Sequence, residues 1–274
     1  MTDATASDPA ELLRAYDAQL REELTSAVST PRLGPLVLAE YLGGRGFITY
    51  TSLGVDGRPA DAASVRRLVE QALAHYEAMP GIRRVEWKTR GHDHAPGLHD
   101  ALVSHGFVPD ESESVMIGEA RLLAVDVDLP AGVVVRRVTD EDDVRRMLAM
   151  QAEVFGDSPE LAAEMETQVL HRLRTGTDDM ELWVAEADGE VVSAGRLEPV
   201  EGTEFAGIWG GATRPQWRGR GIYRALTAAR ARSAIAHGKR YINSDSTEFS
   251  RPILERSGLV KVTTTTPYEW RRPG

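Results

Sequence analysis

The sequence predicts an α/β fold, in the wider sense that includes α+β, built as two related halves. Segments with the apolar spacing of helices alternate with β-branched strand segments along the chain. An internal repeat aligns Leu102–Val108 with Leu254–Val260 through a shared leucine, glycine, apolar residue and valine. Hydrophobic residues make up 42% of the chain, which is enough for a sizeable core. We therefore expect two tandem domains, at residues 1–124 and 125–274.

The first half begins with a helix and a hairpin. Asp8 can cap a helix whose first residue is Pro9. The glycine-rich string at 43–46 lies between two strands and precedes no helix, so we interpret it as a turn and not as a phosphate loop. The expected elements are a helix from residue 9, strands at 36–42 and 47–51, a helix at 60–79, a strand at 82–87, a helix at 96–105, and one or two strands at 107–117.

A linker is expected at 120–132, where acidic residues, proline and glycine gather. The second half then starts a new series, with an acidic helix cap at 139–142 and the hairpin turn Asp188-Gly189. Its expected elements are a strand at 133–138, a helix after residue 142, a helix at 158–173, strands at 182–187, 191–197 and 205–213, a long helix at 222–236, a strand at 241–246, a short helix at 251–257 and a closing strand at 260–270.

The stretch from Trp209 to Gly221 joins a strand to a long helix through a glycine-punctuated turn. Within it, Gln216–Gly221 has the spacing Q-x-x-G-x-G, and residues without Cβ let successive N–H groups turn toward one point at the positive end of the helix. This predicts a cradle for a phosphate or pyrophosphate. Two glycines inside the preceding strand, Gly210 and Gly211, predict a bulge or a close backbone approach.

Charge and composition narrow the classes of function. The net charge of −10 argues against nonspecific nucleic-acid binding, yet residues 205–244 contain eight Lys or Arg and no Asp or Glu. The chain has no cysteine, and its one close histidine pair, His92 and His94, falls in an expected loop, so we expect no metal site. No apolar run suits a membrane span or a secretory signal, and we expect a cytoplasmic protein without nucleic-acid or membrane partners.

Residues 133–272 resemble the GNAT superfamily of acetyl-CoA-dependent N-acetyltransferases. The resemblance rests on the order of elements, on Ala212-Thr213-x-Pro215 followed by Gln216–Gly221, and on a short helix ending in Ser257-Gly258-Leu259. It implies a mixed, mostly antiparallel central sheet flanked by helices. GRGIYRAL and SRPILERSGL also resemble tandem bacterial acetyltransferases. Because residues 1–124 lack the glycine turn, the resemblance implies a degenerate, non-catalytic partner domain.

The resemblance carries cofactor-binding roles onto matching positions. Backbone N–H groups from Arg218 to Tyr223 would hold the pyrophosphate of acetyl-CoA, and two arginines would bond to its phosphates. The chain at Ala212 and Thr213 would pair with the pantetheine arm like an added strand. The cofactor-binding residues predicted in this way are Ala212, Thr213, Gln216, Trp217, Arg218, Gly219, Arg220, Gly221, Ile222 and Tyr223.

The implied reaction is direct attack of a neutral amine on the acetyl carbonyl, with the oxyanion held by a main-chain N–H near the bulge. Many family members place an acidic tyrosine four residues before the glycine that ends the short helix, whereas this chain has Leu254 there. The candidate catalytic residues are therefore Tyr268 as the acid, and Asp245 or Glu204 as the base. A packing or solvent-exposed role is the alternative for each. Glu198 is a further candidate base.

The predicted function is N-acetylation of a small-molecule primary amine. Both halves carry net negative charge, which would attract a cationic amine. Two alternatives stay open: acetylation of a protein lysine or N-terminus, and a non-catalytic acyl-CoA sensor, which the missing tyrosine favours. A dinucleotide-dependent oxidoreductase fits less well, because Q-x-x-G-x-G lacks the first glycine of that fingerprint. The sequence does not determine the oligomeric state, and a homodimer is compatible with it.

Overall fold

The computed structural model describes residues 8–176 and 179–274, which form two compact units. The N-terminal unit contains Ala10–Val115, Ser246–Phe249 and Lys261–Gly274, and the C-terminal unit contains Met116–Asp245 and Ser250–Val260 together with Asp8 and Pro9. No helix within these residues is long and apolar enough to cross a membrane.

The N-terminal unit is a sheet with strand order β1-β2-β3-β4-β12, and β5 also pairs with β12. β3 and β4 are parallel, and the other pairs are antiparallel. Its elements are α1 (Pro9–Gln19), β1 (Arg32–Leu33), β2 (Leu36–Tyr41), β3 (Arg45–Tyr50), α2 (Ala62–Glu77), β4 (Arg84–Arg90), α3 (Leu98–Ser104), β5 (Val108–Pro109) and β12 (Val260–Arg271).

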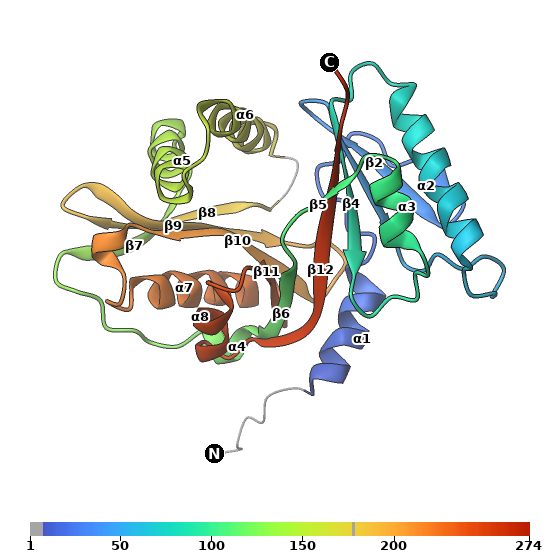
Figure 1. The fold of residues 1–274 in the computed structure, drawn as a ribbon. Helices are drawn as coiled ribbons and strands as arrows, with labels where there is room; N and C mark the ends of the chain where they lie inside the picture. The colour runs from blue at the N-terminus through green and yellow to red at the C-terminus, as the bar shows by residue number, and fades with distance from the viewer. Residues whose placement is uncertain (1–7, 177–178) are drawn as a thin grey trace. The chain divides into compact units, whose positions relative to one another are not determined.

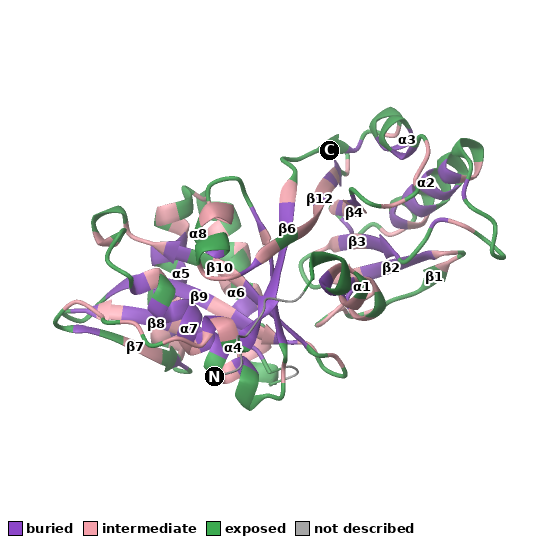
Figure 2. Cartoon of the chain, turned by 90° about the horizontal axis from the view of Figure 1, so that it is seen from below, coloured by how far each residue is buried: buried purple, intermediate pink, exposed green. Residues whose placement is uncertain are grey.

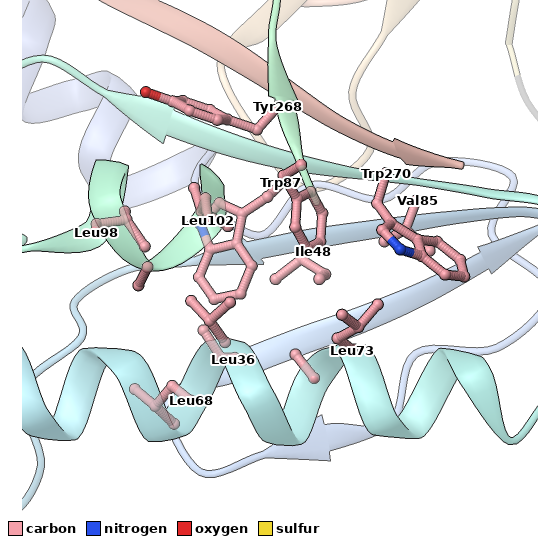
Figure 3. Packing of buried hydrophobic residues seen from close by; sticks show 14 of the residues in the cluster. Leu36, Ile48, Leu68, Leu73, Val85, Trp87, Leu98, Leu102, Tyr268 and Trp270 are labelled. Carbon is pink, nitrogen blue, oxygen red and sulfur yellow. The ribbon is translucent and has the colours of Figure 1, made fainter. Parts of the chain in front are cut away.

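The core of the N-terminal unit lies between its sheet and the helices α2 and α3. Trp87 of β4 is fully buried there, and its ring meets that of Phe107 edge-on at 6.5 Å between centroids. Tyr268 and Trp270 of β12 belong to the same cluster (Figure 3). Asp61 begins α2 with a reciprocal capping box to Ser64, which fixes where this helix starts.

The C-terminal unit is a sheet with strand order β6-β11-β10-β9-β8-β7. β10 and β11 are parallel, whereas the pairs from β10 through β7 are antiparallel. Its elements are β6 (Glu113–Glu119), α4 (Ala120–Leu123), β7 (Val133–Val138), α5 (Glu141–Phe155), α6 (Pro159–Thr175), β8 (Glu181–Ala187), β9 (Glu190–Pro199), β10 (Phe205–Thr213), a 3-10 turn η1 (Pro215–Trp217), α7 (Ile222–Ala236), β11 (Tyr241–Ser246) and α8 (Arg251–Arg256).

Helices cover both faces of this second sheet. α5 and α6 lie on one face, and α7 and α8 lie on the other (Figure 1). One apolar cluster joins α5 and α6 to β8, β9 and β10, and another joins α7, α8 and α4 to β9, β10 and β11. The burial pattern follows these layers, with buried residues concentrated in the strands and in the inner side of α7 (Figure 2). The predicted mixed, mostly antiparallel sheet flanked by helices is thus confirmed.

Two polar anchors hold α7 under the sheet. Glu181 of β8 is almost completely buried and accepts hydrogen bonds from Ser233 of α7 and from Trp183, while His237 and Arg137 also contact it. Arg230 of α7 is fully buried and donates to the carbonyl oxygens of Leu226 and Arg196 and to Thr227. It reaches β9 because Gly195 has no side chain, since a Cβ there would lie 2.5 Å from its guanidinium.

Both halves of the chain end in strand–helix–strand, as the internal repeat predicts. The closing strand of each half nevertheless joins the sheet of the other unit. Met116–Glu119 of β6 belongs to the C-terminal unit, where β6 neighbours β11, whereas β12 pairs with β4 in the N-terminal unit. Each unit therefore takes residues from both sides of residue 124. The predicted domain boundary between residues 124 and 125 separates the two related halves of the sequence and not the two units of the structure, and it stays a prediction.

Most expected elements lie within a few residues of their predicted positions. The segment 120–132 differs, because its first residues form α4. Ala120 and Leu123 are buried in the cluster beneath β10, so this part of the expected linker packs into the core. The acidic composition of the segment obscured the two apolar side chains that secure it.

We expect Glu181→Gln to lower the free energy of unfolding by about 2 kcal/mol at pH 7, because the buried carboxylate bonds to charged and polar groups. Burial by itself would raise the pKa of Glu181, but hydrogen bonds from Ser233, His237 and Trp183 hold it below its usual value. The stability that Glu181 provides is therefore fully present above about pH 4.5, which is the ordinary pKa of a glutamate. It is lost as the pH falls through the lower pKa that Glu181 has in the folded protein. Urea unfolding at several pH values measures both effects.

Glu190→Gln is the matched control, because Glu190 is exposed at the start of β9. We expect it to change stability by less than about 0.5 kcal/mol. Equal losses in the two variants would contradict the anchoring role of Glu181.

Candidate functional site

An extra residue in β10 lies at the centre of the candidate site. Trp209 is opposite Arg196 of β9, whereas Ala212 is opposite Ala194, so three steps along β10 match two along β9. Gly210 has a φ of +60° at this point, which favours glycine over other residues. The bulge predicted from the two strand glycines is confirmed.

The bulge coincides with the place where β10 and β11 separate. The parallel pairing of the two strands runs from Phe205 opposite Tyr241 to Gly207 opposite Asn243. Beyond it, the Ser244 hydroxyl donates to the Ile208 carbonyl at 3.0 Å, and β10 continues to Thr213 without β11 beside it in register. The backbone of β10 from the bulge onward is therefore available for pairing with an extended ligand.

Helices on opposite faces of the sheet contact the two bulge glycines. The side-chain amide of Gln151, on α5, donates to the Gly210 carbonyl. On the other face, a Cβ at Gly211 would lie 2.8 Å from the hydroxyl oxygen of Tyr223, on the first turn of α7. Gly211 thus lets α7 approach β10 closely, and the contacts from both sides hold the irregular backbone in place.

The glycine turn forms an open cap at the start of α7. Gly219 and Gly221 have φ values of +75° and +79°. Gly221 occupies the N-cap position and makes no side-chain cap hydrogen bond, so the capping residue leaves the N–H groups of the first helical turn open to a ligand. A Cβ on Gly219 would meet nothing within 4 Å. This arrangement leaves room for an anion at the positive end of the helix.

Arginines without carboxylate partners surround this cap. Among the described residues, none of Arg218, Arg220 and Arg224 pairs with an Asp or Glu. Arg218 donates through Nε to the Thr213 carbonyl at 3.0 Å, and the Arg220 guanidinium lies 4.9 Å from the ring centroid of Trp217. By contrast, Arg214 is paired with Glu153 at 2.6 Å. The cap thus carries positive charge that no described carboxylate neutralises, as an anionic ligand requires.

The predicted cofactor-binding residues lie along one continuous path from β10 to α7. Ala212 and Thr213 pair with β9 on one side, with the Ser193 hydroxyl 2.8 Å from that of Thr213. The others follow in η1, the cap and the first turn of α7: Gln216, Trp217, Arg218, Gly219, Arg220, Gly221, Ile222 and Tyr223. Ile222 is buried and secures the helix start, whereas the cap itself is exposed. Their cofactor-binding roles stay predictions.

The three candidate catalytic residues are not grouped in one place. Asp245 lies on β11, two residues past the last pair with β10, and so is level with the bulge. Glu204 precedes β10 near Arg240, about 30 Å of strand away from Thr213. Tyr268 belongs to the N-terminal unit, where burial raises its pKa and its hydroxyl lies 2.9 Å from Nδ1 of His99. Of the three, Asp245 alone lies beside the bulge within the C-terminal unit.

The environment of Glu198 keeps its carboxylate charged. One of its oxygens lies 3.1 Å from a nitrogen of Arg196 and 3.1 Å from a nitrogen of Arg172 on α6. Burial alone would raise the pKa of Glu198, but the two arginines lower it below the usual glutamate range. An anion held in this way is a poor proton acceptor at neutral pH, which makes Glu198 an unsuitable general base.

The sequence reading missed Gln151 and Arg196 beside the bulge. Gln151 occupies a buried position in the apolar spacing of α5, and a polar residue there is a signal for a specific hydrogen bond. Arg196 gives no such signal, because an arginine near the end of a strand looks exposed. Leu254, at the position of the usual tyrosine, is buried with Ile208 and Ile242, so it supports the core and carries no proton.

Comparison with known proteins agrees with this arrangement. The family of acetyltransferase (GNAT) domains matches residues 121–244, which contain the bulge, the cap and α7. No protein among those of curated function has a significantly similar sequence.

Several solved structures share the fold over nearly the whole chain. A GCN5-related N-acetyltransferase from Kribbella flavida has a TM-score of 0.64 at 17% identity, covering 97% of this chain and 95% of its own. A conserved protein of unknown function from Staphylococcus epidermidis has a TM-score of 0.68 at 11% identity, covering 94% and 98%.

A tandem GNAT protein from the clavulanic acid biosynthesis pathway has a TM-score of 0.59 at 14% identity, covering 87% of this chain and 79% of its own. At these identities the likeness concerns the fold alone. The match to the family of acetyltransferase (GNAT) domains over residues 121–244 contains both the bulge between the separating strands and the uncapped glycine turn.

Proposed function

We propose that the C-terminal unit transfers an acetyl group from acetyl-CoA to the primary amine of a small molecule. The observation that carries this proposal is the coincidence of the bulge, the separation of β10 from β11 and the uncapped, arginine-lined start of α7. The cap would hold the pyrophosphate, and the free edge of β10 at Ala212 and Thr213 would pair with the pantetheine arm. The acyl group would then reach the bulge.

The bulge would stabilise charge that develops on the acyl oxygen. A main-chain N–H freed from the ladder at Gly210 or Gly211 can point at that oxygen, and the contacts from Gln151 and Tyr223 keep the backbone from relaxing. In the transfer, the amine nitrogen forms a bond to the acyl carbon, the carbon–sulfur bond breaks, the amine loses a proton and the departing sulfur gains one.

Asp245 is the group we propose as the proton acceptor, directly or through water. It lies level with the bulge on β11, beyond the paired part of the strand. Removing a proton from the amine is needed because alkyl amines are mostly protonated at neutral pH. The role of Tyr268 as the acid remains a prediction with less support, because Tyr268 belongs to the N-terminal unit. The same holds for Glu204 as the base, because Glu204 lies at the end of β10 that is far from the bulge.

A non-catalytic acyl-CoA sensor is the second candidate, and Leu254 is the observation that favours it. Its buried, apolar side chain stands where many family members have a proton donor. Binding of acetyl-CoA without turnover on any amine would support this second function.

Acetyl-CoA should raise the thermal midpoint of the wild-type protein, and Gly219→Glu should abolish that increase. The new carboxylate would sit at the open cap and repel the phosphates. Gly238→Glu is the matched control, because Gly238 follows the other end of α7, has a φ of +73° and also has open space at its Cβ. Thermal unfolding of the three proteins with and without acetyl-CoA measures the effect. Equal protection of both variants would contradict the cofactor site.

Asp245→Asn should lower kcat for amine acetylation about 100-fold or more, while acetyl-CoA still protects the variant thermally. Thiol release from acetyl-CoA, followed over a panel of amines, measures the rate. Asp188→Asn, in the exposed β8–β9 turn, is the control with the same loss of charge and should keep the wild-type rate. A fully active Asp245→Asn variant would exclude Asp245 as the base.

A further inference from the structure

We propose that the amine acceptor is a free α-amino acid, whose carboxylate is bound by Arg196. This inference rests on the proposed acetyltransferase function and names its substrate class. It concerns the face of β9, β10 and β11 that also carries α5 and α6, on which Arg196, Glu198 and the Trp209 side chain lie beside the bulge.

Arg196 is mostly buried, and within residues 8–176 and 179–274 its terminal N–H groups have no oxygen acceptor. Its Nε donates to Glu198, and its Nη1 lies 3.8 Å from the Met165 sulfur. These are its side-chain hydrogen bonds to the described part of the chain. A planar guanidinium edge with free donors fits the two oxygens of a carboxylate.

The free edge of Arg196 lies close to the bulge. Its Nη1 is 3.8 Å from the point that a Cβ on Gly210 would occupy. The acyl carbon would be attacked at this same bulge, so the group bound by Arg196 must lie within a few bonds of the attacking nitrogen. An α-amino acid meets this requirement, because one carbon separates its amine from its carboxylate. A lysine side chain or an N-terminus of a protein does not, since neither has a carboxylate so close.

A second donor lies on the same face. The Trp209 indole covers Gly207, where its Nε1 is 2.3 Å from the position of an added Cβ, and among the described residues this N–H has no acceptor. Trp209 and Arg196 are direct neighbours across β10 and β9, and Gly207 is the neighbour of Glu198. The indole of Trp209 therefore lies beside the Arg196–Glu198 pair. An oxygen-rich ligand group bound there would accept hydrogen bonds from both the indole N–H and the Arg196 guanidinium.

The neighbouring charges favour a carboxylate over a phosphate. Glu198 adds a negative charge next to Arg196, and the low pKa of its carboxyl keeps that charge at neutral pH. A dianionic phosphate would be repelled more strongly than a monoanionic carboxylate. Asn243, next to Gly207 on the same face, has a buried side-chain oxygen without a partner in the described residues, which could accept from the ligand's amine.

The test compares free amino acids with their α-carboxamides as acceptors in the thiol-release assay. We expect the wild-type protein to prefer at least one free amino acid over its amide by about 30-fold or more in kcat/KM. Arg196→Gln should remove this preference by lowering the rate on the acid and leaving the rate on the amide nearly unchanged. Arg196→Lys should restore part of it.

The variants should keep the fold, because Glu198 retains its contact with Arg172 when Arg196 is replaced. Arg174→Gln is the matched control, since Arg174 is an exposed arginine of α6 paired with Glu141, and it should leave the preference intact. Acetyl-CoA should protect all of these variants thermally, because the cap at α7 is unchanged.

The outcomes separate the two proposals. Turnover of amines with no preference for the free acid, or equal losses on acid and amide in Arg196→Gln, would overturn the amino-acid assignment and leave the acetyltransferase function standing. If no amine is acetylated, the acetyltransferase function fails, and thermal stabilisation by the twenty amino acids in the presence of CoA then decides the binding site. Stabilisation by an amino acid that Arg196→Gln abolishes would support the amino-acid site. If no amino acid stabilises the wild-type protein, the proposed site is overturned.

Discussion

The rest of the candidate site depends on one extra residue in β10. Inserting a residue between Trp209 and Ala212 breaks the ladder with β9, bends the strand and lets it leave β11 after Gly207. Where β10 has left β11, its edge is open to an extended ligand. The irregular backbone is held by Gln151 on one face and by the close approach of α7 on the other. A rigid irregularity is what a site that stabilises developing charge needs.

The arginines of this chain differ in whether the folded protein supplies acceptors for them. Arg214 is paired with a carboxylate, and Arg230 is buried under β9 with its bonds directed to backbone and hydroxyl oxygens. Arg218 and Arg220 at the helix cap, by contrast, have no acidic partner among the described residues. Because isolated positive charge at a helix start is unfavourable, an anionic ligand would relieve both the helix dipole and the arginines. Arg196 lies between these two cases. Its Nε donates to Glu198, whereas its terminal nitrogens have no carboxylate partner among the described residues and lie beside the bulge.

The two related halves do not fold as two separate stretches of sequence. β6 closes the first half yet contributes to the sheet that contains β11, and β12 closes the second half yet pairs with β4. This explains why Tyr268 packs with His99 and Trp87 in the N-terminal unit, although its sequence position suggested the acetyltransferase unit.

The sequence by itself determined the order of helices and strands, because that order follows from the local spacing of apolar residues. It also determined the bulge at Gly210-Gly211 and the glycine turn before α7, because both need backbone conformations that glycine adopts most easily. It also predicted the GNAT resemblance that the family match confirms over residues 121–244. The tertiary structure decided which unit receives β12, which arginines find carboxylates, and that Gln151 and Arg196 meet at the bulge. These outcomes require contacts between residues far apart in the chain, and local spacing carries no information about such contacts.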